Sequence, residues 1–236
     1  MATKLENRSA VLKSNNVNSA IEQPDGWSHP ASQDRSIILR DELIEAGFRH
    51  LCNAELDSLN IRELASACDV SVGAFYKRFT NKQGFLQTLQ QKIVDETMHE
   101  AELVFASSQI KNMTLREGIE GFVSLMINLF NGRGRGVIRA SYKGLGKDVD
   151  TWEPMRSSSR EIRKLLVAAI VPKLDHQDSI RAEEQVKFVY QVINGTLINE
   201  LLNPWHVFTI ENVKLQIELV ELALSYLEHR SISEDL

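Results

Sequence analysis

The sequence is poor in the residues that make turns, disulfides and strands. It has 12 glycines, 5 prolines and 2 cysteines in 236 residues, and alternating runs of β-branched residues are scarce. Cys52 and Cys68 match no metal-binding or redox spacing, so we expect buried, reduced thiols in a cytoplasmic protein. The balance argues against a disulfide scaffold and favours helices.

Long apolar runs are also absent. No run of about 18 apolar residues occurs, so we expect no membrane span. Near its N-terminus the chain carries Lys4, Glu6, Arg8 and Lys13 and no apolar stretch of signal-peptide length, so we expect no export. The net charge of -5 argues against indiscriminate coating of nucleic acid, but it leaves room for a local basic site.

The residue clusters used by enzymes and metalloproteins are missing as well. No Ser/His/Asp set, carboxylate pair or metal cluster has a spacing that would place its members on one face. The six histidines include no H-x-x-x-H pair. The stretch GRGRG at 132–136 lacks the Gly-Lys-Ser/Thr ending of a P-loop, so we interpret it as a flexible basic loop. We expect no enzyme and no cofactor or metal.

Apolar periodicity and capping residues predict an all-α fold of about nine helices. Residues 1–33 are rich in Asn, Ser, Gln and Pro without periodicity, and we expect a disordered tail there. We divide the rest into one domain over 34–92 and a second over 93–236. The expected helices are 35–52, 60–67, 71–79, 81–105, 114–130, 137–143, 151–174, 178–202 and 210–228.

One stretch of this acidic chain contains no Asp or Glu. Residues 70–94 hold four basic residues, Lys77, Arg78, Lys82 and Lys92. Lys82 falls in the first turn of a predicted helix, where anions are normally preferred. A phosphate held at that helix terminus removes the conflict. The stretch suggests a surface for a polyanion, although outward lysines are also common on ordinary solvated helices.

Two short helices with the N-caps Asn60 and Ser71 precede the basic residues, joined by a turn of about four residues. This is the arrangement of a helix-turn-helix. Asp69 in the turn tolerates a left-handed backbone better than most residues. The second helix of the motif lies in the DNA major groove. We expect its outward residues to be Val72, Gly73, Ala74, Tyr76, Lys77 and Arg78, with Val72 or Ala74 touching a thymine methyl.

The segment Leu43 to Leu89 resembles the DNA-binding domain of the TetR family of transcriptional regulators. Its IRELASACDVSVGAFYKRFTNKQGFL is similar to that family's pattern of a hydrophobe, Arg, an Ile/Leu-Ala pair, then V-S-x-G-x-(L/F)-Y-x-x-F-x-(S/N)-K. The resemblance covers about a fifth of the chain. At Glu55 and Asp69 the family usually has Gly, so we expect the first helix to end differently, near Asn53.

The resemblance implies a homodimer that represses, or less often activates, transcription from a palindromic double-stranded DNA operator. A small molecule bound in the C-terminal helical domain releases it. By position, the resemblance implies that Val72, Gly73, Ala74 and Lys77 lie in the major groove and that Arg62 reaches a base. It implies phosphate contacts for Asn60, Tyr76, Arg78 and Lys82, and Ser71 completes the DNA-binding set.

The resemblance also implies that the last two helices pair with their dimer mates. The two apolar faces of 210–228 and the small Gly195 agree, although a buried core helix in a monomer is the alternative. Large residues in the C-terminal helices are candidates for an effector pocket, although most such residues are simply core: Phe122, Met126, Phe130, Tyr142, Trp152, Met155, Phe188, Tyr190 and Trp205. The alternative function is a helical protein-interaction adaptor without specific DNA binding.

Overall fold

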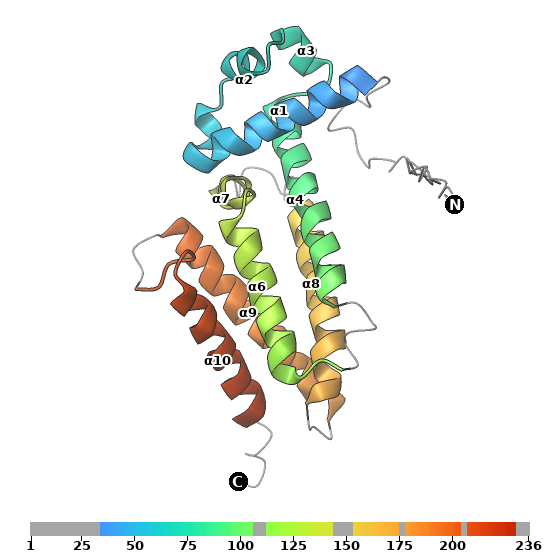
Figure 1. Ribbon diagram of the computed structural model, residues 1–236, viewed down its shortest axis with the longest axis vertical. Coiled ribbons are helices and arrows are strands. Elements are labelled where there is room, and N and C mark those ends of the chain that lie inside the picture. Colours follow the sequence, from blue (N-terminus) through green and yellow to red (C-terminus); the bar gives the residue numbers. More distant parts are fainter. Residues whose placement is uncertain (1–33, 106–111, 144–152, 175–177, 204–206, 230–236) are drawn as a thin grey trace, which may run out of the picture.

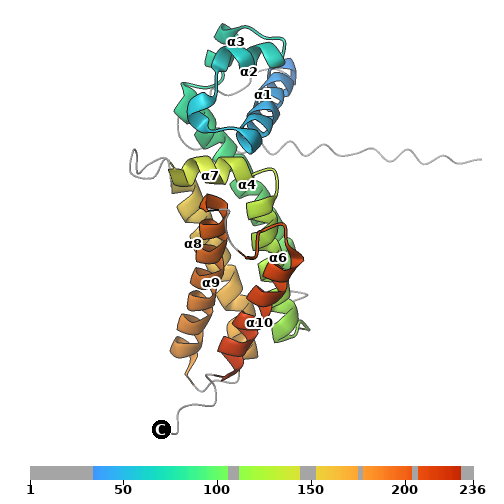
Figure 2. The ribbon, with the colours of Figure 1, turned by 90° about the vertical axis from the view of Figure 1, so that its left-hand side faces the viewer.

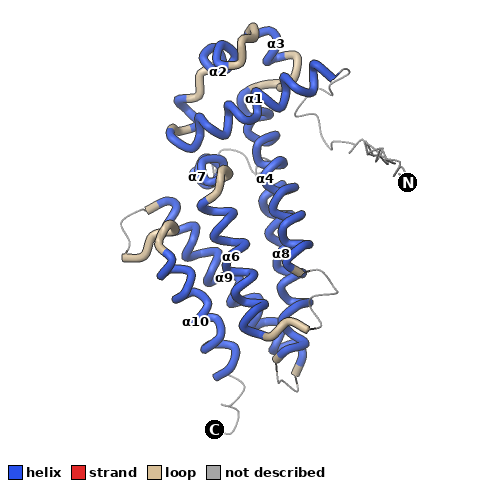
Figure 3. The backbone as a smooth tube through the Cα atoms, viewed as in Figure 1, coloured by secondary structure: helices blue, strands red, loops and turns tan. Residues whose placement is uncertain are grey.

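The computed structural model describes residues 34–105, 112–143, 153–174, 178–203 and 207–229 (Figure 1). These residues form nine α-helices and two 3-10 helices, and within them no strand is present (Figure 3). The predicted all-α class is confirmed. The predicted tail over 1–33 lies outside the described residues, as do Trp152 and Trp205.

Three helices form the head of the molecule, at the top of Figure 1. They are α1 (Asp34–Asn53), α2 (Ile61–Ala67) and α3 (Val72–Tyr76), with the 3-10 helix η1 (Leu56–Ser58) after α1. The long helix α4 (Lys82–Val104) starts in the head and continues into the body of the molecule. The predicted domain boundary at residue 92 therefore falls within a continuous helix.

The body is a helical bundle that includes the lower part of α4. Its other elements are α6 (Leu115–Asn131), α7 (Arg135–Lys143), α8 (Glu153–Ile170), η3 (Val171–Lys173), α9 (Ser179–Leu202) and α10 (Val213–His229). Helices α6 and α8 pack on α4, α9 packs on α6 and α8, and α10 packs on α6 and α9. Helix α7 lies across the end of the bundle beneath the head (Figure 2).

Capping side chains begin the helices at the predicted places. Asn60, Ser71, Asn81 and Asp178 each accept a hydrogen bond from the backbone N–H of the helix that follows. At Asn60 the side-chain amide also donates to Glu63 Oε1 at 3.0 Å. Local sequence therefore sets the starts of these four helices.

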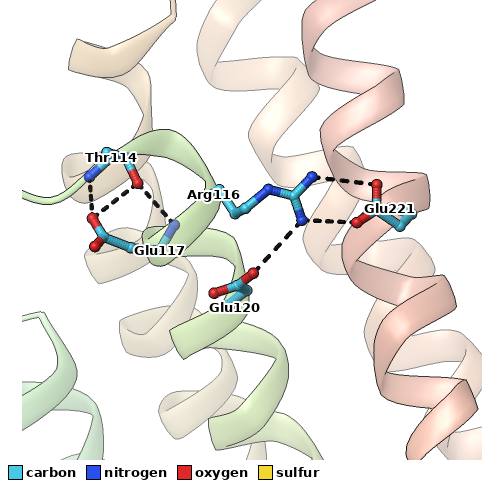
Figure 4. Close-up of polar contacts among 5 residues, drawn as sticks. All are labelled: Thr114, Arg116, Glu117, Glu120 and Glu221. Carbon is cyan, nitrogen blue, oxygen red and sulfur yellow. Dashed lines mark hydrogen bonds and ion pairs between the residues drawn. The ribbon is translucent and has the colours of Figure 1, made fainter.

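Helix α6 begins with a complete capping box (Figure 4). The Glu117 carboxylate accepts from the Thr114 backbone N–H at 2.7 Å, and the Thr114 hydroxyl accepts from the Glu117 N–H at 3.2 Å. In the same turn Arg116 pairs with Glu221 of α10 at 2.7 Å and with Glu120 at 3.6 Å. The start of α6 is thus fixed locally and linked to α10.

Four helices differ from their predicted lengths: α7 begins at Arg135, α8 ends at Ile170 before the 3-10 helix η3, and α3 and α10 are shorter than expected. Helix α3 ends at Tyr76 instead of Phe79, although the backbone N–H of Phe79 still donates to Phe75 O at 3.0 Å. Helix α10 begins at Val213 instead of Ile210, because the Asn212 side chain accepts from the backbone N–H of the second helical residue at 2.9 Å. A capping asparagine was therefore missed at Asn212.

The buried apolar residues form two clusters, one in the head and one in the body. The head cluster is centred on Phe75, Phe79 and Phe85, whose ring centroids lie 4.7–5.3 Å apart. Val137 and Ala140 of α7 also belong to this head cluster. Helix α7 is therefore packed against the head although the chain reaches it only after α6.

Candidate nucleic-acid interface and effector cavity

One face of helix α3 is packed against the rest of the head, and the opposite face is exposed. Phe75 is fully buried, whereas Gly73 and Lys77 are exposed. A Cβ at Gly73 would meet no atom closer than Ser71 Oγ, at 3.7 Å. Another molecule, such as DNA, can therefore approach the α3 backbone closely at this glycine.

The turn before α3 depends on Asp69. Its φ is 54°, and it is the one non-glycine residue with positive φ in the described part of the chain. The next residue, Val70, returns its backbone N–H to Ala65 O at 3.0 Å. The predicted left-handed turn at Asp69 is confirmed. As also expected, the first helix ends at Asn53, and Glu55 adopts an extended backbone with φ of -83°.

The predicted DNA-binding cations differ in their surroundings. Arg62 and Lys77 are exposed, and neither side chain makes a hydrogen bond or ion pair within the described residues. Arg78 is half-buried, and its guanidinium donates to Ala74 O at 2.8 Å and to Ser36 Oγ at 3.0 Å. Arg78 thus joins the end of α3 to the start of α1, so its guanidinium is already engaged inside the head.

The other residues expected at phosphates are also unequal. Lys82 is half-buried and donates from Nζ to Asp57 O at 3.1 Å, while the Asn60 side chain is used in capping α2. Tyr76 is 48% exposed, with its ring edge against Phe75 at 5.3 Å. Val72 and Ala74 are half-buried, and Ser71 is the exposed N-cap of α3. The accessible surface therefore centres on α3 and the start of α2.

Helix α7 meets the C-terminal end of α1 at very close range. A Cβ at Gly136 would lie 2.1 Å from Leu51 O, so only glycine fits there without a backbone shift. Arg139 donates to Leu51 O at 3.1 Å and to Ala54 O at 3.4 Å. These cationic contacts lie at the negative end of the α1 dipole, where they are favourable.

Arg133 holds three parts of the molecule together just before α7. Its guanidinium pairs with Glu45 of α1 at 2.6 Å and with Glu96 of α4, and it lies over the Phe48 ring at 4.6 Å from the centroid. The sequence interpretation of GRGRG as a flexible basic loop is corrected in part, because residues 132–134 form a turn whose Arg133 is ion-paired, whereas Arg135 and Gly136 begin α7. We call Arg133, Gly136, Arg139 and Lys143 the head–body joint.

The body encloses a small cavity of about 20 Å³ between α4, α6, α7, α8 and α9. Five of the predicted pocket residues line it: Met126, Phe130, Tyr142, Met155 and Tyr190. Phe122 is fully buried beside it, with its ring 5.8 Å from Tyr190. Phe188 is a correction, because it is 47% exposed and packs on Tyr226 at 5.3 Å, in an open groove between α9 and α10.

One side of the cavity is polar and uncharged. Tyr142 is hydrogen-bonded to Asn194, and its burial raises the pKa of Tyr142 to about 12. Burial likewise raises the pKa of Tyr190, which is hydrogen-bonded to Ser159. Asn194 and Ser159 were not predicted, although each follows a predicted pocket residue by four positions, a spacing that shares one helix face.

The cysteines are not buried, contrary to expectation. Cys52 is exposed, and its thiol donates to Arg133 O at 3.7 Å. Cys68 is half-buried and donates to Glu42 O at 3.6 Å, and burial raises the pKa of its thiol. Across the described ranges, no three His, Cys, Asp or Glu side chains gather in a group able to hold a metal ion. Nor does any helix in those ranges have the length and apolarity needed to cross a membrane.

The geometry defines an all-helical protein with a helix-turn-helix head and a helical body. Residues 43–89 match the family model described as bacterial regulatory proteins, tetR family. The predicted resemblance is confirmed over these residues, and the head has the helix-turn-helix fold of that family's N-terminal domain. A search of curated proteins finds no match to the chain.

Solved structures of transcriptional regulators share the fold of about 80% of this chain, which includes both head and body. A regulator from Rhodococcus sp. Rha1 superposes with a TM-score of 0.64 at 17% identity, covering 80% of this chain and 95% of that one. FadR from Bacillus subtilis, in complex with stearoyl-CoA, gives 0.59 at 16% identity, covering 80% and 99%. A tetR-family regulator from Streptomyces coelicolor gives 0.58 at 17%, covering 80% of each chain. At such identities the likeness establishes the fold.

Proposed function

We propose that this protein is a sequence-specific repressor that binds a palindromic DNA operator as a homodimer and leaves it when a small molecule binds the body. The observation that carries the proposal is the open face of α3, where Gly73 and Lys77 are exposed on a helix anchored by the buried Phe75. A recognition helix needs this combination of a rigid mount and a polar, sterically open face.

The direct DNA contacts follow from accessibility. We assign base contacts to Arg62, Gly73 and Lys77, which are exposed. Lys82 has two ammonium protons beyond the one given to Asp57, and these serve a phosphate at the start of α4. Arg78 acts indirectly, because its bonds to Ser36 and Ala74 fix the orientation of α3 on α1.

Apolar side chains exposed on α9 and α10 support the dimer. Phe188, Ile217 and Leu222 are each about half exposed. No atom lies within 4 Å of a Cβ placed on Gly195, so another helix can approach α9 there. A monomer rarely leaves several large apolar residues uncovered on neighbouring helices. We assign this surface to the second copy of the chain.

Contacts between the cavity and the head support release by an effector. Ile93 of α4 lines the cavity and also belongs to the head cluster. Tyr142 lines it from α7, the helix that contacts α1 through Gly136 and Arg139. A ligand that displaces either residue shifts an element bound to the head, and thereby biases the DNA-binding arrangement. FadR from Bacillus subtilis, which shares this fold, was solved with a small molecule bound, stearoyl-CoA.

Fluorescence anisotropy on DNA from upstream of the gene tests the proposal. Binding should exceed that to random DNA and weaken steeply with salt, because phosphate contacts release counterions. Lys82→Ala should weaken binding to all sequences alike, whereas Lys77→Ala should also alter sequence preference. Affinity no higher than for random DNA would leave the adaptor function as the better account.

Light scattering tests the dimer separately. The wild-type protein should have a dimer mass at micromolar concentration, and Leu222→Glu should lower it by placing a charge in the α9–α10 surface. Leu103→Glu is the matched control, because Leu103 is 59% exposed on α4, away from that surface. A monomer mass for the wild type, or equal effects of both variants, would reject the assigned interface.

A further inference from the structure

The cavity in the body is lined by no charged side chain. Its thirteen lining residues comprise seven apolar residues and six neutral polar ones. The polar groups gather as two hydrogen-bonded pairs, Tyr142 with Asn194 and Tyr190 with Ser159. An ion entering this site would lose its hydration without gaining an opposite charge from the lining, which is strongly unfavourable.

Arg163 is the nearest group that could change this balance. Its guanidinium lies over the Tyr190 ring at 5.7 Å from the centroid, and it does not line the cavity. The Tyr190 ring thus contacts both this charge and the cavity. Arg163 is therefore the residue to vary when anions are tested.

The walls favour a flat and compact ligand. The volume of about 20 Å³ is near that needed by one water molecule, so a larger guest must displace side chains. Met126 and Met155 are unbranched thioethers, which change conformation at low cost. The rings of Phe130, Tyr142 and Tyr190 offer faces and edges for an aromatic guest.

We propose that the cavity accepts an uncharged molecule of about one aromatic ring, bearing a polar group that hydrogen-bonds to the Tyr142–Asn194 pair. The proposal rests on the proposed function for its regulatory meaning, because such a ligand would be the effector. Two features of the cavity decide which ligands bind. Tyr142 and Asn194 select the polar substituent, and the uncharged lining rejects ionised analogues of the same shape.

Three probes of similar shape test the charge selectivity: phenol, benzoate and benzylamine. Calorimetry and ligand-observed NMR on the full chain at pH 7 should detect phenol binding, with the two ions at least about tenfold weaker. The proposal is overturned if no probe binds, or if an ion binds as tightly as phenol. Benzoate binding that disappears in Arg163→Gln would locate an anion site instead.

Variants test the position of the ligand. Tyr142→Phe should weaken phenol about tenfold and leave toluene unchanged, because only the hydroxyl is removed. Tyr226→Phe, outside the cavity, should change neither. Ser158→Val adds bulk to the lining and should abolish binding of both probes, with its melting temperature reporting whether it is folded. Phenol binding unaffected by Tyr142→Phe and by folded Ser158→Val would refute the site.

DNA binding is measured in a separate anisotropy experiment, so the two proposals can fail independently. Phenol binding without specific DNA binding would reject the repressor function and retain the ligand site. Specific DNA binding with no preference for phenol over the ions would retain the repressor function and reject the ligand site.

Discussion

Two basic segments of this chain are used in opposite ways. In the head, Lys77 is exposed at the C-terminal end of α3 without a partner among the described residues. In the head–body joint, Arg133 pairs with Glu45 and Glu96, and Lys143 pairs with Glu55. The two segments differ in whether acidic residues are available to pair with their basic side chains. Residues 70–94 contain none, so that surface keeps its positive charge for an external anion.

The glycines of the two segments differ in the same way. Gly136 is enclosed by the backbone of α1, with Leu51 O 2.1 Å from a would-be Cβ, whereas Gly73 faces open space. Glycine therefore permits close helix packing in the joint, and in the head it permits approach by a partner. Substitutions at these positions should separate folding from DNA binding.

The largest effect is expected from Gly136→Ala. The added methyl must displace backbone, so we expect a loss of about 2 kcal/mol in stability and a fall of about 4–8 °C in melting temperature. Gly73→Ala is the control and should keep or raise stability by about 0.5–1 kcal/mol while weakening DNA binding. Calorimetry and anisotropy distinguish the two. Equal stability of both variants would contradict the close contact at Leu51.

Exchanging the cations for neutral residues comes next. Lys77→Ala should reduce affinity for the specific site by about 1–3 kcal/mol without lowering the melting temperature. Arg133→Met should lower stability by about 1 kcal/mol, because two partly exposed ion pairs and a cation–π contact are lost. Arg133→Met should reduce affinity for the specific DNA site by less than Lys77→Ala does. The opposite ranking would show that Arg133, and not Lys77, is the DNA-facing cation.

Asp69 tests the turn that aims α3. Asp69→Gly should stabilise the head slightly, because glycine adopts a φ of 54° without strain. Asp69→Ala should destabilise it by about 1 kcal/mol relative to the glycine variant. Denaturant titration measures both changes. An alanine variant as stable as the glycine variant would argue against a left-handed residue at this position.

The smallest effect is expected from the pH dependence of the joint. The hydrogen bond from Lys143 holds the pKa of Glu55 below its ordinary value, so its stabilisation is present above the ordinary carboxyl range and is lost as pH falls through the lowered pKa. Lys143→Met should therefore lower the melting temperature by about 1 °C at neutral pH and by less in acid.

Lys92→Met is the matched control for this experiment. Lys92 is exposed and has no partner among the described residues, so its substitution should give no pH-dependent difference. A loss for Lys143→Met that is constant from neutral to acidic pH would show that packing of its aliphatic stem, and not the pair with Glu55, is responsible.

The sequence by itself determined most of the helices and their starting points. Caps such as Ser71, Asn81 and Thr114 act on backbone groups two or three residues away, so their effect is legible in the local sequence. The helix-turn-helix was predictable for the same reason, because its two helices are neighbours in the chain. The domain limits at 34–92 and 93–236 stay a prediction.

Only the tertiary structure decided how the second basic segment is used. Arg133 lies 88 residues from Glu45 along the chain, so the local sequence could not indicate their pairing. The cavity likewise gathers side chains from five helices. Only this packing shows that Tyr190 lines the cavity whereas Phe188, two residues earlier, is exposed. Capping and periodicity follow from short-range geometry, whereas charge pairing and enclosure depend on contacts that exist only after the helices have packed.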